Sequence, residues 1–188
     1  MKRKIIIVLS IIFIIFMAAV LVFYLVKGDS SRWLVAIGGI IVSALPLLLL
    51  FMKNNPFNAP ILIAFYLFIF GSIYLGSIAS FYYRFMWWDS VLHFYKGILL
   101  GFVGIALYKR LIQEKAQKDI SKWVIFLFVV SLSVTASVIW EIYEFVGDLT
   151  FTHTMQLGGN KDTMIDLICG MAGALLAGIY SIVKKPKV

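Results

Sequence analysis

Ionisable side chains recur along one face of each of three apolar segments, at the spacing of an α-helix. The sets are Asp89, His93 and Lys96 at i, i+4 and i+7; Glu141, Glu144 and Asp148 at i, i+3 and i+7; and Asp162 and Asp166 at i, i+4. Carboxylate oxygens together with one imidazole suit a hard or borderline divalent cation, such as Mg²⁺, Mn²⁺, Zn²⁺ or Fe²⁺. The candidate metal ligands are therefore Asp89, His93, Glu141, Glu144, Asp162 and Asp166.

Three of the carboxylates also have a simpler interpretation as helix-end groups. Asp89 and Asp162 stand at predicted helix starts, where a carboxylate can cap free N–H groups and interact favourably with the helix dipole. Asp148 stands at a predicted helix end, where it can be solvated. His93, Glu141, Glu144 and Asp166 lie deeper, and we expect them to form a shared polar site. Metal binding by that site is a further hypothesis.

The chain that positions these residues is strongly apolar. Of its 188 residues, 62% are hydrophobic and only 14% are charged, whereas a soluble domain carries about 25% charged residues. The mean hydropathy of +0.99 indicates that the excess runs through the whole chain, which excludes a water-soluble enzyme. The net charge of +8 lies in short flanks between apolar runs rather than on one basic face, so nucleic acid is not an expected partner.

Six apolar windows meet or approach the length of about 20 residues that crosses a bilayer. They are residues 5–26, 33–52, 61–82, 90–108, 123–147 and 164–183. The sequence therefore predicts an all-α polytopic membrane protein, a bundle of six transmembrane helices that forms a single domain over residues 1–188. The first window is too long for a signal peptide and lacks a clear cleavage site, so we expect it to be retained.

The distribution of Lys and Arg predicts the orientation, because cytoplasmic flanks carry the excess of positive charge. With the N-terminus inside, 12 of the 17 Lys and Arg residues fall in inner flanks and 4 in outer flanks, with Lys96 inside a span. Both termini are then cytoplasmic in a bacterial plasma membrane, and the three acidic sets lie at the outer side. The inner halves of the last three spans carry no acidic, basic or histidine side chain, which favours a pocket open only to the outside.

Other residues of the last three spans have mainly structural interpretations. Small residues repeat at spacings that let helix backbones approach closely, at Gly97, Gly101, Gly104, Gly170, Ala174 and Gly178. Cys169, the single cysteine, is more typical of a small core residue than of a nucleophile. Trp140 is interpreted as an interfacial anchor, and His153 lies in an outer loop that could cover the pocket.

Three blocks of sequence carry a resemblance to known families. They are WWDSVLHFYKGILLGF from Trp87, WEIYEFVGD from Trp140 and QLGGNKDTMIDLICGMAGALLAG from Gln156. They resemble the YjdF-type family of small bacterial inner-membrane proteins of unknown function and, more distantly, VanZ-like proteins, a group named for glycopeptide resistance. The resemblance implies a shared site at Asp89, His93, Glu141, Glu144, Asp162 and Asp166. It supplies no established reaction.

The leading functional hypothesis is an outward-facing pocket that holds a divalent metal and binds or acts on a lipid or cell-envelope headgroup. As a membrane-embedded hydrolase, it would hold the metal through His93, Glu141, Glu144 and Asp166, with another carboxylate as general base toward water and Lys96 steadying a phosphate. The candidate catalytic residues are then Glu141, Glu144 and Lys96. A second hypothesis is a non-catalytic envelope or antibiotic-resistance accessory protein, whose polar cluster serves packing or partner binding. A third is an ion or small-solute transporter, which the uncharged inner halves argue against.

Overall fold

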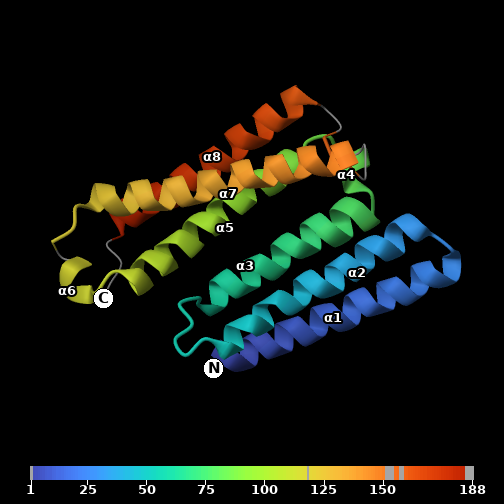
Figure 1. Ribbon diagram of the computed structural model, residues 1–188, viewed down its shortest axis with the longest axis horizontal. Coiled ribbons are helices and arrows are strands. Elements are labelled where there is room, and N and C mark those ends of the chain that lie inside the picture. The colour runs from blue at the N-terminus through green and yellow to red at the C-terminus, as the bar shows by residue number, and fades with distance from the viewer. Residues whose placement is uncertain (1, 118, 151–154, 157–158, 185–188) are drawn as a thin grey trace. The chain divides into compact units, whose positions relative to one another are not determined.

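The structure is a computed structural model that describes residues 2–117, 119–150, 155–156 and 159–184, and its regular elements are all helices, with no strand among those residues (Figure 1). The all-α class is therefore confirmed. The elements in chain order are α1 (Lys2–Lys27), α2 (Ser30–Ala44), η1 (Leu45–Phe51), α3 (Ala59–Ile69), η2 (Phe70–Ile78), α4 (Phe81–Arg84), α5 (Trp88–Leu111), α6 (Glu114–Gln117), α7 (Lys122–Thr150) and α8 (Asn160–Val183).

Six helical segments are long and apolar enough to cross a membrane, as predicted. They are Lys2–Lys27, Ser30–Phe51, Ala59–Ile78, Trp88–Leu111, Lys122–Thr150 and Asn160–Val183. The observed ends differ from the predicted windows because helices extend through polar residues at their first and last turns. The third segment instead ends early, at Ile78, because Ser80 adopts a left-handed backbone conformation with φ 63°.

The chain divides into two compact units, Met1–Trp88 and Asp89–Val188. In the first, α1, α2 and α3 lie side by side (Figure 1). A buried hydrogen-bond chain links them: Ser10 Oγ and Tyr66 Oη are 2.6 Å apart, and the tyrosine hydroxyl donates to Ser43 O at 3.0 Å. The prediction of one domain over the whole chain stays a prediction.

Two of the spanning segments are not regular α-helices along their full length. The 3₁₀ segment η1 follows α2 directly and has Pro46 in its first turn, where the missing N–H does least damage to helical hydrogen bonding. The π-helical segment η2 follows α3 in the same way.

At the turn between α1 and α2, Asp29 caps α2 by accepting a hydrogen bond from Arg32 N.

The second unit is built around close contacts of α5, α7 and α8, as the small-residue spacing predicted. A Cβ atom placed on Gly97 of α5 would lie 2.1 Å from Gly170 O of α8, and one on Gly173 would lie 2.2 Å from Phe94 O. Ser133 of α7 donates a hydrogen bond to Gly97 O at 2.9 Å. Backbone therefore packs directly against backbone, and this proximity brings the side chains at one end of the three helices together.

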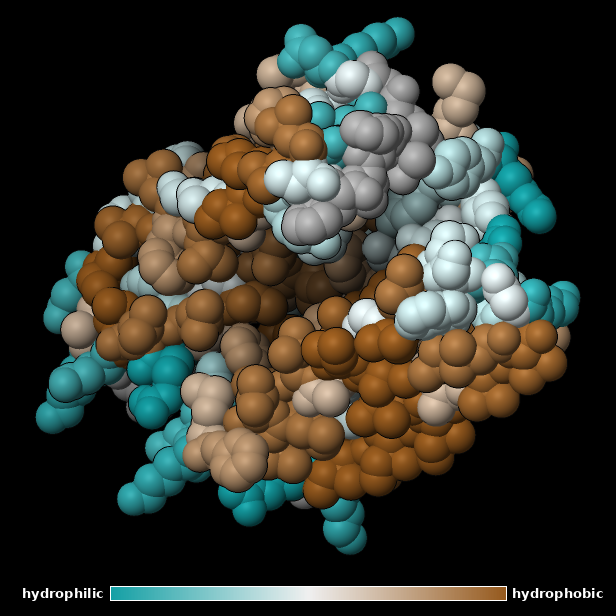
Figure 2. All heavy atoms as spheres, turned by 45° about the vertical axis from the view of Figure 1, so that its right-hand side comes forward, coloured by the Kyte–Doolittle hydropathy of each residue, from teal (hydrophilic) through white to brown (hydrophobic). Residues whose placement is uncertain are grey.

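The outward faces of the helices are largely apolar. Brown, hydrophobic side chains dominate the face shown in Figure 2, and large apolar residues such as Leu48, Ile139 and Ile168 are exposed. In water this surface would be unfavourable, but lipid chains can cover it. The fold is thus that of a multi-pass membrane protein.

Candidate metal centre

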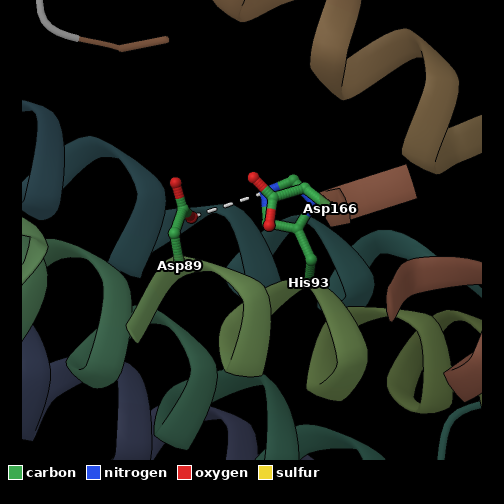
Figure 3. A group of neighbouring side chains, drawn as sticks. All are labelled: Asp89, His93 and Asp166. Atoms are coloured by element: carbon green, nitrogen blue, oxygen red, sulfur yellow. Dashed lines mark ion pairs between the residues drawn. The ribbon is translucent and has the colours of Figure 1, made fainter. Parts of the chain in front are cut away.

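Helix α5 carries three of the predicted site residues in its first turns. His93 and Lys96 are buried, with 2% and 5% of their surface exposed, and Asp89 is half-buried. The i, i+4 spacing places Asp89 one turn before His93, and Asp89 Oδ1 lies 3.5 Å from His93 Nε2 (Figure 3). One nitrogen of the imidazole therefore faces a carboxylate of its own helix.

Helix α8 brings Asp166 to the same place. Because α8 begins at Asn160, Asp166 lies about 9 Å along its axis, at about 1.5 Å per residue. Asp166 is only 1% exposed, and its Oδ1 accepts a hydrogen bond from Ser90 Oγ of α5 at 2.9 Å. Asp89, His93 and Asp166 offer ligand atoms that all lie within 4.8 Å of one another, and we call them the first ligand group.

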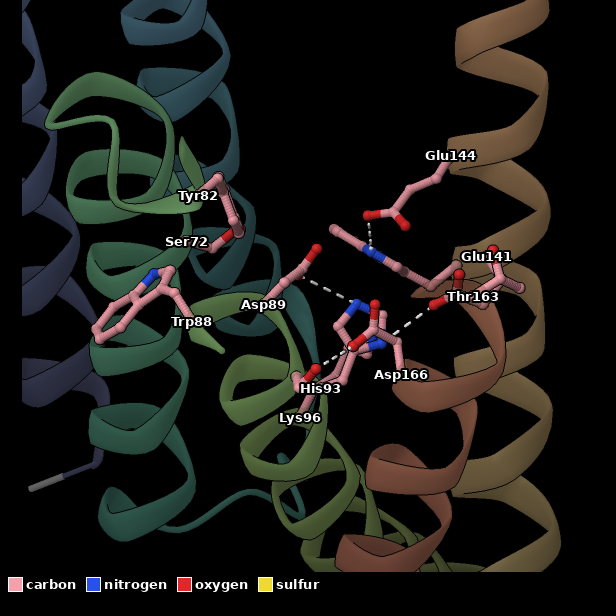
Figure 4. A network of polar contacts seen from close by, with 12 residues as sticks. Ser72, Tyr82, Trp88, Asp89, His93, Lys96, Glu141, Glu144, Thr163 and Asp166 are labelled. Atoms are coloured by element: carbon pink, nitrogen blue, oxygen red, sulfur yellow. Dashed lines mark hydrogen bonds and ion pairs between the residues drawn. The ribbon is translucent and has the colours of Figure 1, made fainter. Parts of the chain in front are cut away.

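Helix α7 supplies carboxylates to the other side of the imidazole (Figure 4). Glu141 Oε1 lies 3.1 Å from His93 Nδ1, yet this buried oxygen accepts no hydrogen bond from any described residue. Glu144, one turn further along, accepts a hydrogen bond from Trp140 Nε1 at 2.8 Å. His93, Glu141 and Glu144 also offer ligand atoms within 4.8 Å of one another, and we call them the second ligand group.

Lys96 lies beside the second ligand group. Its Nζ is 3.3 Å from His93 Nδ1 and 4.6 Å from the centroid of the Trp140 ring, so the ammonium rests on the negative face of the indole. Among the described residues, no carboxylate oxygen lies within 4.0 Å of Lys96 Nζ, the limit for an ion pair. The ammonium is thus a buried cation near the carboxylates but not paired directly with one.

The charge of this cluster is unbalanced. The two ligand groups contain four carboxylates, and Lys96 supplies a single positive charge, which leaves three negative charges in excess when all are ionised and His93 is neutral. Burying uncompensated charge is costly, so intramembrane carboxylates usually acquire a counter-charge. The chemistry of the donor set, oxygens and one imidazole, fits a divalent cation.

The structure brings five of the six predicted metal ligands into these two groups and leaves Asp162 outside them. Asp162 lies in the first turn of α8, half-buried, one turn before Asp166. Asp148 accepts hydrogen bonds from the backbone N–H groups of Met155 and Gln156, at 3.0 and 2.8 Å, so it holds these two residues beside the end of α7. His153 lies outside the described residues.

The sequence analysis did not identify two residues of the cluster as site residues. Ser90 of α5 donates a hydrogen bond to Asp166, and nothing in its position beside Asp89 predicted that contact. Trp140 was interpreted only as an anchor, although its i, i+4 spacing to Glu144 is the spacing of the observed hydrogen bond. Half-buried Cys169 lies on α8, and as the chain's single cysteine it has no partner for a disulfide within the chain.

Comparisons with known proteins agree with the membrane architecture. The sequence profile of a family described as predicted membrane proteins, DUF2238, matches residues 8–186, and this is the YjdF family that the motifs suggested. An uncharacterized protein of Thermotoga maritima is 29% identical over 101 residues, which cover 53% of this chain and 50% of that protein. The chain thus spans about half the length of this curated relative. No solved structure matches, and the likeness to VanZ-like proteins stays a prediction.

Proposed function

This chain belongs to the DUF2238 family of predicted membrane proteins, and we propose that it binds a divalent metal ion through Asp89, His93 and Asp166. These residues come from α5 and α8, at the end of the second unit where both helices begin and α7 ends. Two carboxylates and one imidazole form a three-ligand set, which leaves coordination positions for a substrate. The ion is of the Mg²⁺, Mn²⁺, Zn²⁺ or Fe²⁺ class.

The observation that carries this proposal is the placement of the His93 imidazole between two carboxylates, Asp89 at Nε2 and Glu141 at Nδ1. A neutral imidazole has one N–H and can donate to only one of them. An imidazolium could donate to both, but it would bring a second cation against Lys96. A metal ion at Nε2 gives Asp89 a positively charged partner and leaves the ring proton on Nδ1, the nitrogen that Glu141 faces. In metal-binding histidines, a carboxylate commonly lies at the ring nitrogen that does not bind the metal.

The charge count supports the same proposal. A divalent ion in the first ligand group removes two of the three excess negative charges of the cluster. Glu144 is only half-buried and accepts a hydrogen bond from Trp140, so it is suited to carry the remaining charge. Without a cation, four carboxylates within a few ångströms of one imidazole would oppose one another in a medium that screens charge poorly.

The reaction that fits such a site best is hydrolysis at a lipid or cell-envelope headgroup. A bound divalent ion would supply Lewis acidity toward a phosphoryl or carbonyl oxygen. Glu144 is the candidate general base, because it is less buried than Glu141 and lies on the same face of α7. Glu141 holds the orientation of His93. The role of Lys96 in steadying a phosphate stays a prediction.

The proposed location follows from the charge distribution of the flanks. With both termini in the cytoplasm of a bacterium, the metal centre lies at the outer side of the plasma membrane. At the opposite end of the second unit, Tyr108, Ile125, Val129 and Ala177 form a buried apolar cluster. This cluster supports a site open at one side over a polar pathway for a transported ion.

The metal content of the detergent-purified protein tests the proposal. We expect a stoichiometric divalent metal in the wild type and its loss in Asp166→Asn, which keeps the size of the side chain and its contact with Ser90. Asp162→Asn is the matched control, because it makes the same change one turn away on α8, outside both ligand groups. A metal-free wild type, or equal loss in both variants, would contradict the assignment.

A non-catalytic role in helix packing is the second candidate, and one observation favours it. The hydrogen bond from Ser90 to Asp166 joins α5 to α8 without any metal. If packing is the only role, Asp166→Asn lowers the unfolding temperature while the wild type carries no metal. Thermal unfolding measured beside the metal content therefore separates the two candidates.

A further inference from the structure

The second ligand group differs from the first in that a cation of the protein itself lies beside it. Lys96 Nζ is 3.3 Å from His93 Nδ1, the ring nitrogen that Glu141 also faces at 3.1 Å. No comparable cation lies beside Asp89 and Asp166 among the described residues: Asp89 faces His93 Nε2, and Asp166 accepts from the Ser90 hydroxyl. The two sides of one imidazole thus present different electrostatic environments.

We propose that His93, Glu141 and Glu144 form a latent second metal site, and that the positive charge of Lys96 keeps a metal ion out of it. The lysine thereby directs the metal to the first ligand group, Asp89, His93 and Asp166. This inference rests on the proposed metal-binding function. It assigns Lys96 a role in selecting the metal position, and it predicts a latent metal site that opens when the lysine charge is removed.

The geometry of the second ligand group supports a latent site. Glu141 is 5% exposed, its Oε1 lacks a hydrogen-bond partner among the described residues, and this oxygen points at His93 (Figure 4). A buried carboxylate oxygen that accepts no hydrogen bond is costly, and it is available as a ligand atom for a cation. Together with the imidazole and Glu144, it completes the three ligands that a divalent ion needs.

Trp140 holds the lysine where it acts. Its ring lies under the ammonium at 4.6 Å, and its indole N–H donates to Glu144. The same side chain therefore positions both the cation and one carboxylate of the second group. A divalent ion bound there would have to displace the ammonium from its place beside Nδ1 or tolerate its charge at close range.

A neutral imidazole offers one lone pair to a metal ion, so one metal binds through one ring nitrogen. With Lys96 present, the side of Nδ1 already has positive charge, and the metal binds at Nε2. With the charge removed, the Nδ1 side has two carboxylates and no cation, and it becomes able to bind the metal. The choice between the two groups therefore depends on the charge of one side chain.

Restoration of metal binding tests this inference. In the wild-type background, Asp166→Asn removes a ligand of the first group, and we expect no metal because Lys96 prevents use of the second group. In the double variant Lys96→Met with Asp166→Asn, we expect stoichiometric Zn²⁺ or Mn²⁺ to return, and a further Glu144→Gln change should abolish it again. Lys96→Arg with Asp166→Asn is the matched control, which keeps the charge and should remain without metal.

The outcomes distinguish this inference from the proposed function. Metal retained in the single variant Asp166→Asn contradicts the proposed ligands. Metal absent from both the single and the double variant, with unchanged helical circular dichroism and unfolding temperature, overturns the role of Lys96 alone. Because Met could pack poorly, Lys96→Gln with Asp166→Asn serves as a second neutral variant, and failure of both to regain metal counts against the inference.

Discussion

Replacing Glu141 by Gln should weaken metal binding without changing the number of ions bound. Glu141 Oε1 lies 3.1 Å from His93 Nδ1, on the side of the ring away from Asp89, so in our account it orients the imidazole rather than ligating the metal. Loss of such a supporting carboxylate typically costs about 10-fold to 100-fold in metal affinity. This corresponds to about 1.4–2.8 kcal/mol of binding free energy.

Titration of metal-depleted protein with Zn²⁺ against a chromophoric chelator measures this change. We expect an unchanged endpoint and a dissociation constant raised within that range. Glu144→Gln is the matched control, because it makes the same change on α7 at a carboxylate that contacts Trp140 rather than His93, and its effect should be smaller. An endpoint near zero for Glu141→Gln would mean that Glu141 is itself a ligand, and unchanged affinity would mean that it does not support His93.

Two further predictions concern stability and its dependence on pH. Gly173→Ala should lower the free energy of unfolding by about 1–3 kcal/mol, because the new Cβ would meet Phe94 O at 2.2 Å. Gly38→Ala, also in a helix, meets nothing within 4 Å and should not lower it in the same thermal unfolding assay. The hydrogen bond from the Arg32 side chain holds the pKa of Asp29 below its ordinary value of 3.8. Its contribution to stability is therefore present above pH 3.8 and is lost as the pH falls below that value. Asp29→Asn should flatten this acid-side decline in a series of unfolding measurements across pH, and an unchanged decline would contradict the assignment.

The sequence was sufficient to predict the membrane helices, because length and hydropathy alone determine which segments can span a bilayer. Their irregular parts were not predicted. The third window, residues 61–82, is largely apolar beyond Ile78, yet the helix ends at Ile78 because Ser80 has a left-handed backbone conformation. Side-chain hydropathy carries no information about such a local backbone change, and a serine is an ordinary residue in an apolar segment.

The residues of the candidate site were predicted from the sequence, but their arrangement in space was not. Periodicity places Asp162 and Asp166 on one face of α8, but it does not give the rotation and depth of α8 against α5. Close packing at Gly97 and Gly170 sets that rotation, and it brings Asp166 to His93 while Asp162 stays a turn away. Which ring nitrogen of His93 faces which carboxylate also depends on this packing, so no spacing rule could supply it.

An anomalous-diffraction map of crystals grown with Zn²⁺ or Mn²⁺ would test the central claim most directly. We predict a peak within bonding distance of His93 Nε2, Asp89 and Asp166, with Glu141 at the opposite ring nitrogen. A well-ordered site without a peak, or a wild-type peak between Glu141 and Glu144 on the Nδ1 side, would contradict it.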